Sequence, residues 1–366
     1  MKKIYNFAAT PPSIPSEILE EANAALLSYK NKGLSIVEIG YNSTEYDRLL
    51  KSTESSLRKL LNIPSNYKVL FMQGGAVAQY SAVPLNLLSE HRCADYVISG
   101  QHSKNASLEA KKYGDIAIAA SSAGALPPFS TVPEMKRSDF RPDADYVYIC
   151  FNNIIHGSKF HYVPDTGNIP LVADMSHFLL SEPIDVSKFA LIYASSEGNI
   201  GPAGLTVVII RDDIIGGARK DAPALLNYKL VFEERTSENS PPVWNLYLAN
   251  LMFKWIEDNG GLEEIKRRGE RKASLIYDYL DNQSYYTAPV SKKCRSMLHV
   301  VFVTGDASLD KKFVKEAKAE GLVNIIGHSS VGGMRASIYN AMPYEGVKKL
   351  VDFMKRFAQE NPKLDA

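Results

Sequence analysis

The chain has 366 residues and a formal net charge of +1, so it can bury a large core divided between two domains. Without a long run of one charge, it offers no patch typical of nucleic-acid or membrane binding, and no segment reaches the ~18 apolar residues of a membrane span or resembles a signal peptide. Its three cysteines are widely spaced and odd in number, which argues against a metal cluster or disulfide framework and favours the cytoplasm.

The first part of the chain predicts an extended arm followed by helices. Three prolines among residues 11–15 favour the extended arm, and a helix is expected to begin near Ser16. A second helix is expected over about Thr44–Leu61.

A strand at Lys68–Met72 then leads through two glycines into an apolar helix over about Ala76–Leu88. Free backbone N–H groups and the helix dipole converge at such a turn, which makes it a candidate anion site. The residues concerned are Gly75, Ala76 and Val77.

Short apolar segments of strand length recur after this turn. They cover Tyr96–Ser99, Ile116–Ala119, Asp145–Cys150, Ile169–Ala173, Leu191–Tyr193 and Thr206–Ile210. Helical or loop segments separate most of them, which predicts an α/β fold with a largely parallel sheet. Ligands bind at the carboxyl ends of strands in such sheets. Four polar residues follow strands in this sense, namely His102, Asn152, Asp174 and Glu197.

The last third of the chain predicts an α+β segment. A long apolar helix over about Val243–Asp258 is followed by a charged helix over about Leu262–Asn282. The later elements are expected at Leu298–Val303 (strand), Leu309–Glu320 (helix), Val323–Ile326 (strand), Met334–Tyr339 (strand) and Pro343–Asn361 (helix).

Five stretches spread along the chain carry a resemblance to a known family. They are NFAATPPSIP at 6–15, NIPSNYKVLFMQGG at 62–75, AVPLNLL at 82–88, NIGPAGLTVVI at 199–209 and GGMRASIYNAMP at 332–343. Together they resemble the phosphoserine aminotransferases, which are class-V, fold-type-I enzymes that use pyridoxal phosphate. The resemblance implies a large domain of residues 16–260 with a mostly parallel seven-stranded sheet. It also implies a small α+β domain made of residues 1–15 and 261–366, and a homodimer.

The resemblance also assigns cofactor residues. Asp174 would keep the pyridine nitrogen protonated, which makes the ring an electron sink; the alternative is a strand-end carboxylate that caps a loop. His102 stands where the family places an aromatic residue against the ring, and is also a candidate general acid or base. Asn239 and Ser240 match polar residues that reach the partner subunit's cofactor phosphate. The remaining cofactor candidates are Gly75, Ala76, Val77, Asn152 and Glu197.

On the substrate side, Arg335 matches the family arginine that binds the substrate carboxylate, which implies an amino or oxo acid; a structural ion pair is the alternative. His328 and Tyr41 are further substrate-side candidates. Cations that the family uses for the substrate phosphate are replaced, and the residues at those positions are Asn42, Val77 and Ser329. We therefore expect a substrate without a phosphate group.

The family's cofactor-binding lysine belongs directly before Asn199, where this chain has Gly198. Glycine can neither bond to the cofactor nor carry a proton. We therefore expect non-covalent pyridoxamine phosphate, or pyridoxal phosphate as an external aldimine, with a histidine as proton shuttle. Two alternatives stay open: an enzyme that uses the old pocket without pyridoxal phosphate, and a non-catalytic subunit that pairs with a lysine-bearing paralogue. Glu197 and Ile154, which replace polar family residues, favour these alternatives.

Overall fold

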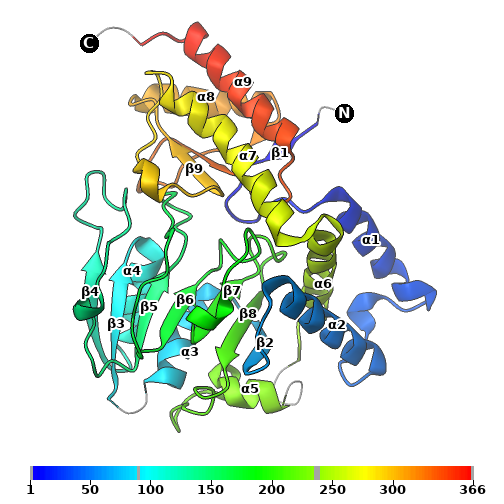
Figure 1. Ribbon diagram of the computed structural model, residues 1–366. Coiled ribbons are helices and arrows are strands. Elements are labelled where there is room, and N and C mark those ends of the chain that lie inside the picture. Colours follow the sequence, from blue (N-terminus) through cyan, green and yellow to red (C-terminus); the bar gives the residue numbers. More distant parts are fainter. Residues whose placement is uncertain (1–2, 89–90, 235–239, 364–366) are drawn as a thin grey trace.

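The computed structural model describes residues 3–88, 91–234 and 240–363. Figure 1 shows a large sheet with helices on both faces and, above it in this view, a smaller group of strands and helices. No helix within these ranges is both long enough and apolar enough to cross a membrane.

The large sheet has seven strands and is mostly parallel, as the sequence predicts. In chain order they are β2 (Tyr67–Gln73), β3 (Cys93–Ile98), β4 (Asp115–Ser121), β5 (Tyr146–Cys150), β6 (Leu171–Asp174), β7 (Leu191–Ser195) and β8 (Leu205–Arg211). Their spatial order is β2-β8-β7-β6-β5-β3-β4. Strand β8 runs antiparallel to both of its neighbours, whereas every other pair is parallel. The α/β fold class is thereby confirmed.

Alternation along the strands gives the sheet two apolar faces. In β5, Val147 and Ile149 pack into one core, while Tyr148 packs into the other. The first core is completed by helices α1 (Ser16–Leu27), α2 (Thr44–Leu61) and α6 (Val243–Asp258). The second is completed by α3 (Ala76–Leu87), α4 (Gln101–Ala110) and α5 (Tyr228–Glu234). Burial on both faces explains why these strands are almost wholly apolar in sequence.

A further apolar cluster unites the two ends of the chain. It is built on α7 (Gly261–Asp281), β9 (His299–Phe302), α8 (Ala307–Ala319), β10 (Leu322–Val323), β11 (Met334–Ser337) and α9 (Tyr344–Glu360). Strand β1 (Tyr5–Asn6) joins it by pairing in parallel with β10, and β9 pairs antiparallel with β11. This cluster supports our proposal of a small domain built from both ends, although α7 also contributes Leu262 and Ile265 to the core of the large sheet.

Some elements differ from the sequence prediction. Strands β1 and β10 are two residues long and form only because they pair with each other. The strand expected over Val323–Ile326 ends early, because Asn324 takes a left-handed conformation (φ 60°) and Ile326 is 63% exposed. Helices α4 and α5 were not predicted, and α4 begins with QHSKN, which lacks an apolar period.

Candidate active site

The ends of adjacent strands bring the predicted polar residues to one edge of the large sheet. Asp174 is the last residue of β6, and its register partners are Cys150 of β5 and Tyr193 of β7. Asn152 follows β5 and Glu197 follows β7, so both lie beside Asp174 at the carboxyl edge. This is where parallel sheets bind ligands.

Asp174 is held in one orientation by Ser176. Its Oδ1 accepts hydrogen bonds from the backbone N–H and the hydroxyl of Ser176, at 3.0 and 2.6 Å. The Ser176 hydroxyl in turn accepts from the backbone N–H of Ser195 at 3.1 Å. No hydrogen bond to Oδ2 occurs within the described residues, although Asp174 is 96% buried. A buried carboxylate with one oxygen unused suits a ligand that donates a hydrogen bond.

The turn between β2 and α3 has the geometry of an anion site. Gly74 has φ +100°, a conformation that glycine tolerates and most side chains do not. Helix α3 begins after Gly75 without a side-chain cap, so the N–H groups of Ala76 and Val77 have no capping side chain, while that of Ala78 donates to the carbonyl of Gly75 at 3.1 Å. Val77, in that first turn, is 73% exposed. The backbone here offers hydrogen bonds to an anion at the same edge of the sheet.

His102 lies in the first turn of α4 rather than in a loop. Its Nδ1 forms a hydrogen bond with the hydroxyl of Tyr80 at 3.0 Å, and burial lowers its pKa below the usual value. The glycine before this helix makes close packing possible, because a Cβ at Gly100 would lie 2.2 Å from Oδ1 of Asn153. A larger residue there would displace the start of the helix that carries His102.

Three histidines that the sequence analysis did not single out also come to this edge. The rings of His102 and His177 have centroids 6.0 Å apart, as do those of His177 and His299. His156, against the ring of Phe129, lies close enough to His102 and His328 for their charges to lower its pKa. Five of the seven histidines thus surround one site. His177 could have been selected from the sequence, because it comes three residues after Asp174 and so follows the end of the same strand.

Burial opposes the charged form of three of these histidines. Burial, reinforced by the charge of His102, lowers the pKa of His177 to about 3, and burial lowers that of His156 to about 4. Burial also holds the pKa of His299 well below its ordinary value. No group of His, Cys, Asp and Glu in the described part of the chain has an arrangement that would hold a metal ion.

Arg335, on β11, brings a cation to the site without a counter-ion. Its Nη1 donates to the carbonyl of Ile154 at 3.1 Å, and burial lowers its pKa. Its Nε is buried without a partner, and none of the ion pairs between described residues includes it. Among the described residues, nine buried polar side-chain atoms have no partner, and five of them gather here: Asn152 Oδ1, Asn153 Oδ1, His156 Nδ1, His299 Nε2 and Arg335 Nε. Such a concentration is typical of a site that a polar ligand completes, with donors for the two amide oxygens and an acceptor for Nε of Arg335.

Gly198 is buried and tightly enclosed. A Cβ at this position would lie 3.0 Å from the carbonyl oxygen of Ser176, 3.5 Å from Cε1 of Tyr339 and 3.9 Å from Cα of His177. The absence of a side chain at Gly198 therefore leaves little free space at this position. The carbonyl of Ser176 would have to move by a few tenths of an ångström to admit any side chain.

The other predicted residues are placed as follows. His328 is half-buried, with Nδ1 2.8 Å from the hydroxyl of Ser330, and its charge lowers the pKa of His102. Tyr41 and Ser240 are exposed, and no side-chain hydrogen bond joins either to the histidines within the described residues. Asn239 lies outside the described residues.

Comparison with known proteins identifies the family. The class-V aminotransferase model matches residues 4–350. The chain belongs to the class-V aminotransferases. It is 46% identical over 363 residues to a phosphoserine aminotransferase of Janthinobacterium sp. (strain Marseille), which covers 98% of this chain and 99% of the relative.

Solved structures place this class-V aminotransferase within the phosphoserine aminotransferase family. That of Bacillus circulans subsp. alkalophilus has a TM-score of 0.94 and 40% identity, and the match covers 98% of this chain and 99% of that one. The pyridoxal-phosphate-bound phosphoserine aminotransferase of Trichomonas vaginalis has a TM-score of 0.90 and 35% identity, with coverage of 96% and 100%. The fold-type-I fold is therefore established.

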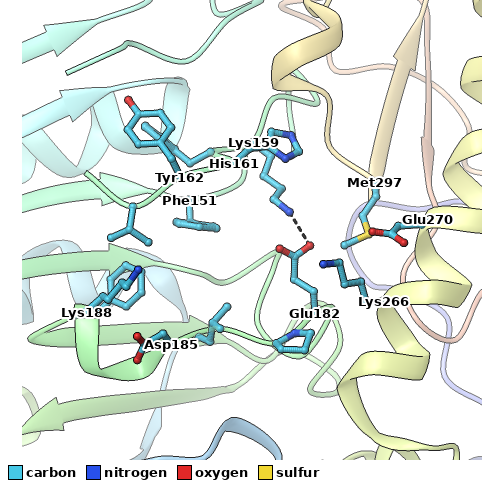
Figure 2. A pocket seen from close by; sticks show the side chains of 15 residues that line it. Phe151, Lys159, His161, Tyr162, Glu182, Asp185, Lys188, Lys266, Glu270 and Met297 are labelled. Carbon is cyan, nitrogen blue, oxygen red and sulfur yellow. Dashed lines mark hydrogen bonds and ion pairs between the residues drawn. The ribbon is translucent and has the colours of Figure 1, made fainter. Parts of the chain in front are cut away.

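A separate cleft of about 410 Å³ is lined in part by Lys159. Figure 2 shows Lys159 reaching toward Glu182, with Lys266 and Glu270 of helix α7 on the opposite wall. Nζ of Lys159 is 2.6 Å from Oε2 of Glu182, and burial lowers its pKa. The cleft shares no lining residue with the histidine site. Lys104, two residues after His102 in the sequence, is exposed on α4.

Proposed function

We propose that this class-V aminotransferase binds pyridoxamine phosphate or pyridoxal phosphate without a covalent bond and acts on a non-phosphorylated amino or oxo acid. The observation that carries the proposal is a buried, partly unpaired polar site in which Asp174 and Arg335 are present while position 198 is glycine.

The residues at the sheet edge fit the cofactor. Oδ2 of Asp174 is free to accept from a protonated pyridine nitrogen, and the uncapped first turn of α3 suits a phosphate. His102, fixed by Tyr80, offers a ring face. When bound, the cofactor acts as an electron sink that makes a proton on the substrate carbon easier to remove. The pyridoxal phosphate in the Trichomonas vaginalis relative supports the same use of the fold here.

Two observations support binding without a covalent bond. Gly198 has no amine, and its surroundings are filled by Ser176 and Tyr339. Lys159 is engaged by Glu182 in the separate cleft. Neither position offers a free amine in the histidine site.

The charges around the site support a substrate with a carboxylate but no phosphate. Arg335 is the cation with unused hydrogen-bonding capacity, and a guanidinium binds a carboxylate with two parallel hydrogen bonds. A phosphate carries nearly two charges and needs several donors. At the positions where the resemblance expects further cations, this chain has Asn42, Val77 and Ser329.

We further propose a cytoplasmic homodimer. The three cysteines are free and buried, as suits a reducing compartment. Ser240 is exposed on the monomer, where a partner subunit's cofactor could meet it. Size-exclusion chromatography with light scattering should give twice the chain mass of 40.5 kDa. A monomer at micromolar concentration would contradict this assignment.

Equilibrium dialysis against pyridoxamine phosphate and pyridoxal phosphate tests the proposal. We expect saturable binding of both, reversed by dialysis. Asp174→Asn keeps the shape of the side chain but removes its charge, and should weaken binding at least 10-fold, as for the loss of a hydrogen bond to a charged group. Asp185→Asn, in the separate cleft, is the matched control and should bind as the wild type does.

Absence of binding at millimolar cofactor would favour an enzyme that has abandoned the cofactor or a non-catalytic subunit. Equal affinities for Asp174→Asn and wild type would place the cofactor elsewhere. Tight binding of O-phosphoserine would overturn the assignment of a non-phosphorylated substrate.

A further inference from the structure

We propose that His177 is the side chain that transfers the proton in this site. Its imidazole would take over proton transfer, because position 198 is glycine and has no amine. The inference rests on the proposed function. It assigns to His177 the role for which the sequence analysis considered only His102.

The first argument is position. The Cα of His177 lies 3.9 Å from the place of a Cβ at Gly198, closer than any group except Ser176 and Tyr339. The imidazole of His177 lies between the rings of His102 and His299, with both centroid distances at 6.0 Å. His177 therefore lies next to the position that a side chain at residue 198 would occupy.

The second argument is the tautomer. The hydroxyl of Tyr339 donates to the carbonyl of Ala9 at 2.9 Å, and a carbonyl can only accept. That hydroxyl therefore accepts at its 3.0 Å contact with Nδ1 of His177, so Nδ1 carries the hydrogen. In a neutral imidazole the other nitrogen, Nε2, then carries the lone pair. Tyr339 thus orients His177 as the carboxylate orients the base of a catalytic triad.

The third argument is what each histidine already does. Nδ1 of His102 contacts the hydroxyl of Tyr80, and Nδ1 of His299 contacts that of Ser337, both at 3.0 Å, but within the described residues neither hydroxyl has a second hydrogen bond that fixes which partner donates. His299 is fully buried and its Nε2 has no partner. His177 combines a defined base nitrogen, partial exposure and contact with the neighbourhood of Gly198.

Four charged or titratable side chains face His177, and so does one backbone carbonyl. The side chains are His102, His299, Arg335 and Tyr339, and the carbonyl is that of Glu197. Burial and the charges of His102 and Arg335 lower the pKa of His177, whereas the carbonyl of Glu197 raises it. A carboxylate on Arg335 would cancel one of the opposing charges and favour proton uptake at Nε2.

The proposed step conserves protons and electrons. Nε2 of His177 removes the proton from one carbon of the bound ligand and leaves the electron pair with the ligand. The protonated imidazole, which can exchange this proton with solvent, then gives a proton back to the same carbon or to a carbon two atoms away, where the electron pair forms the new C–H bond. Tyr339 keeps the ring in place, and His177 is neutral again at the end.

The test uses the full-length protein with pyridoxamine phosphate in D₂O. Equilibrium dialysis measures affinity, and mass spectrometry measures exchange of the methylene hydrogens of the bound ligand. His177→Gln should retain affinity within about 3-fold and slow the exchange by 10²- to 10⁴-fold, the range for general acid–base catalysis. His161→Gln, a histidine of the separate cleft, is the matched control and should change neither quantity.

Two more variants separate proton transfer from a structural role. Tyr339→Phe keeps the ring but removes the acceptor for Nδ1, so it should slow exchange while affinity is retained. His177→Gly should regain exchange when free imidazole is added, an effect that a merely structural residue would not show. If His177→Gln does not fold, comparing the exchange rates of Tyr339→Phe and the wild type still tests whether His177 transfers the proton.

Exchange by His177→Gln within 5-fold of the wild type would overturn the inference, as would a larger loss in His102→Gln. So would wild-type protein that binds pyridoxamine phosphate yet exchanges its hydrogens no faster than the free compound. Failure to bind the compound at all is a different result, because it overturns the proposed function first.

Discussion

Replacing Arg335 with methionine should affect the ligand and the fold differently. Arg335→Met removes the hydrogen bond from Nη1 to Ile154 but also removes the buried, unpartnered Nε. A hydrogen bond to a charged group contributes about 1.5–3 kcal/mol, and an unsatisfied buried donor costs about 1–3 kcal/mol. These two effects offset each other, so the unfolding free energy of the empty protein should change by less than about 1 kcal/mol. Carboxylate binding has no such compensation and should weaken by about 1.5–3 kcal/mol, or roughly 10- to 150-fold.

Isothermal titration with L-glutamate and L-serine, in the presence of pyridoxal phosphate, measures the affinity, and urea unfolding measures the stability. Arg271→Met is the matched control, because this exposed guanidinium only packs over the ring of Tyr344. Unchanged amino-acid affinity in Arg335→Met would refute the assignment. A loss of several kcal/mol in stability would show instead that Arg335 is a structural cation.

Three other predictions address the same site. Gly198→Lys should create a covalent attachment to pyridoxal phosphate that borohydride fixes; an unlabelled variant would indicate a pocket without the cofactor. Lys272→Met should lower the free energy of unfolding, measured in urea, by roughly 3–5 kcal/mol. The reason is that Nζ of Lys272 lies within hydrogen-bond distance of four backbone carbonyls between Ile338 and Met342, including that of Tyr339 at 2.7 Å. A loss below about 1 kcal/mol would show that these hydrogen bonds do not stabilise the segment. The pKa of folded His177 lies near 3, below the ordinary 6.5, so the unfolded chain binds more protons as pH falls through this window. As the pH is lowered through this window, the free energy of unfolding should therefore decrease by up to about 1.4 kcal/mol per pH unit because of this histidine. His177→Gln should make that decrease less steep when the free energy of unfolding is measured by urea unfolding at several pH values. An unchanged dependence on pH would contradict the prediction.

The sequence predicted elements that depend on local pattern and missed those that depend on distant partners. Inner strands of the large sheet such as β5 and β6 are buried on both faces, so their apolar runs stand out in the sequence. Strand β1 has no such pattern, because it exists only by pairing Tyr5 and Asn6 with residues 322 and 323. Helix α5 lies next to residues 235–239, which are outside the described part of the chain.

For the site, the order of the strands was enough to place Asp174 and Glu197, because Asp174 ends β6 and Glu197 comes two residues after the end of β7. It could not place His299, which comes from β9 and meets His177 only through the packing of the two cores. Nor could it measure space at Gly198, since the limiting atom is the backbone oxygen of Ser176. The unpaired Nε of Arg335 is likewise visible only once its neighbours are known.

Borohydride trapping of the wild-type protein tests the central claim most directly. Protein saturated with pyridoxal phosphate is reduced, passed through gel filtration and weighed intact by mass spectrometry, with Gly198→Lys as the positive control. We predict that the wild type binds the cofactor in dialysis but gains no mass after reduction. A stoichiometric mass gain, mapped by digestion to a lysine such as Lys159 or Lys104, would contradict a site that works without a covalent bond.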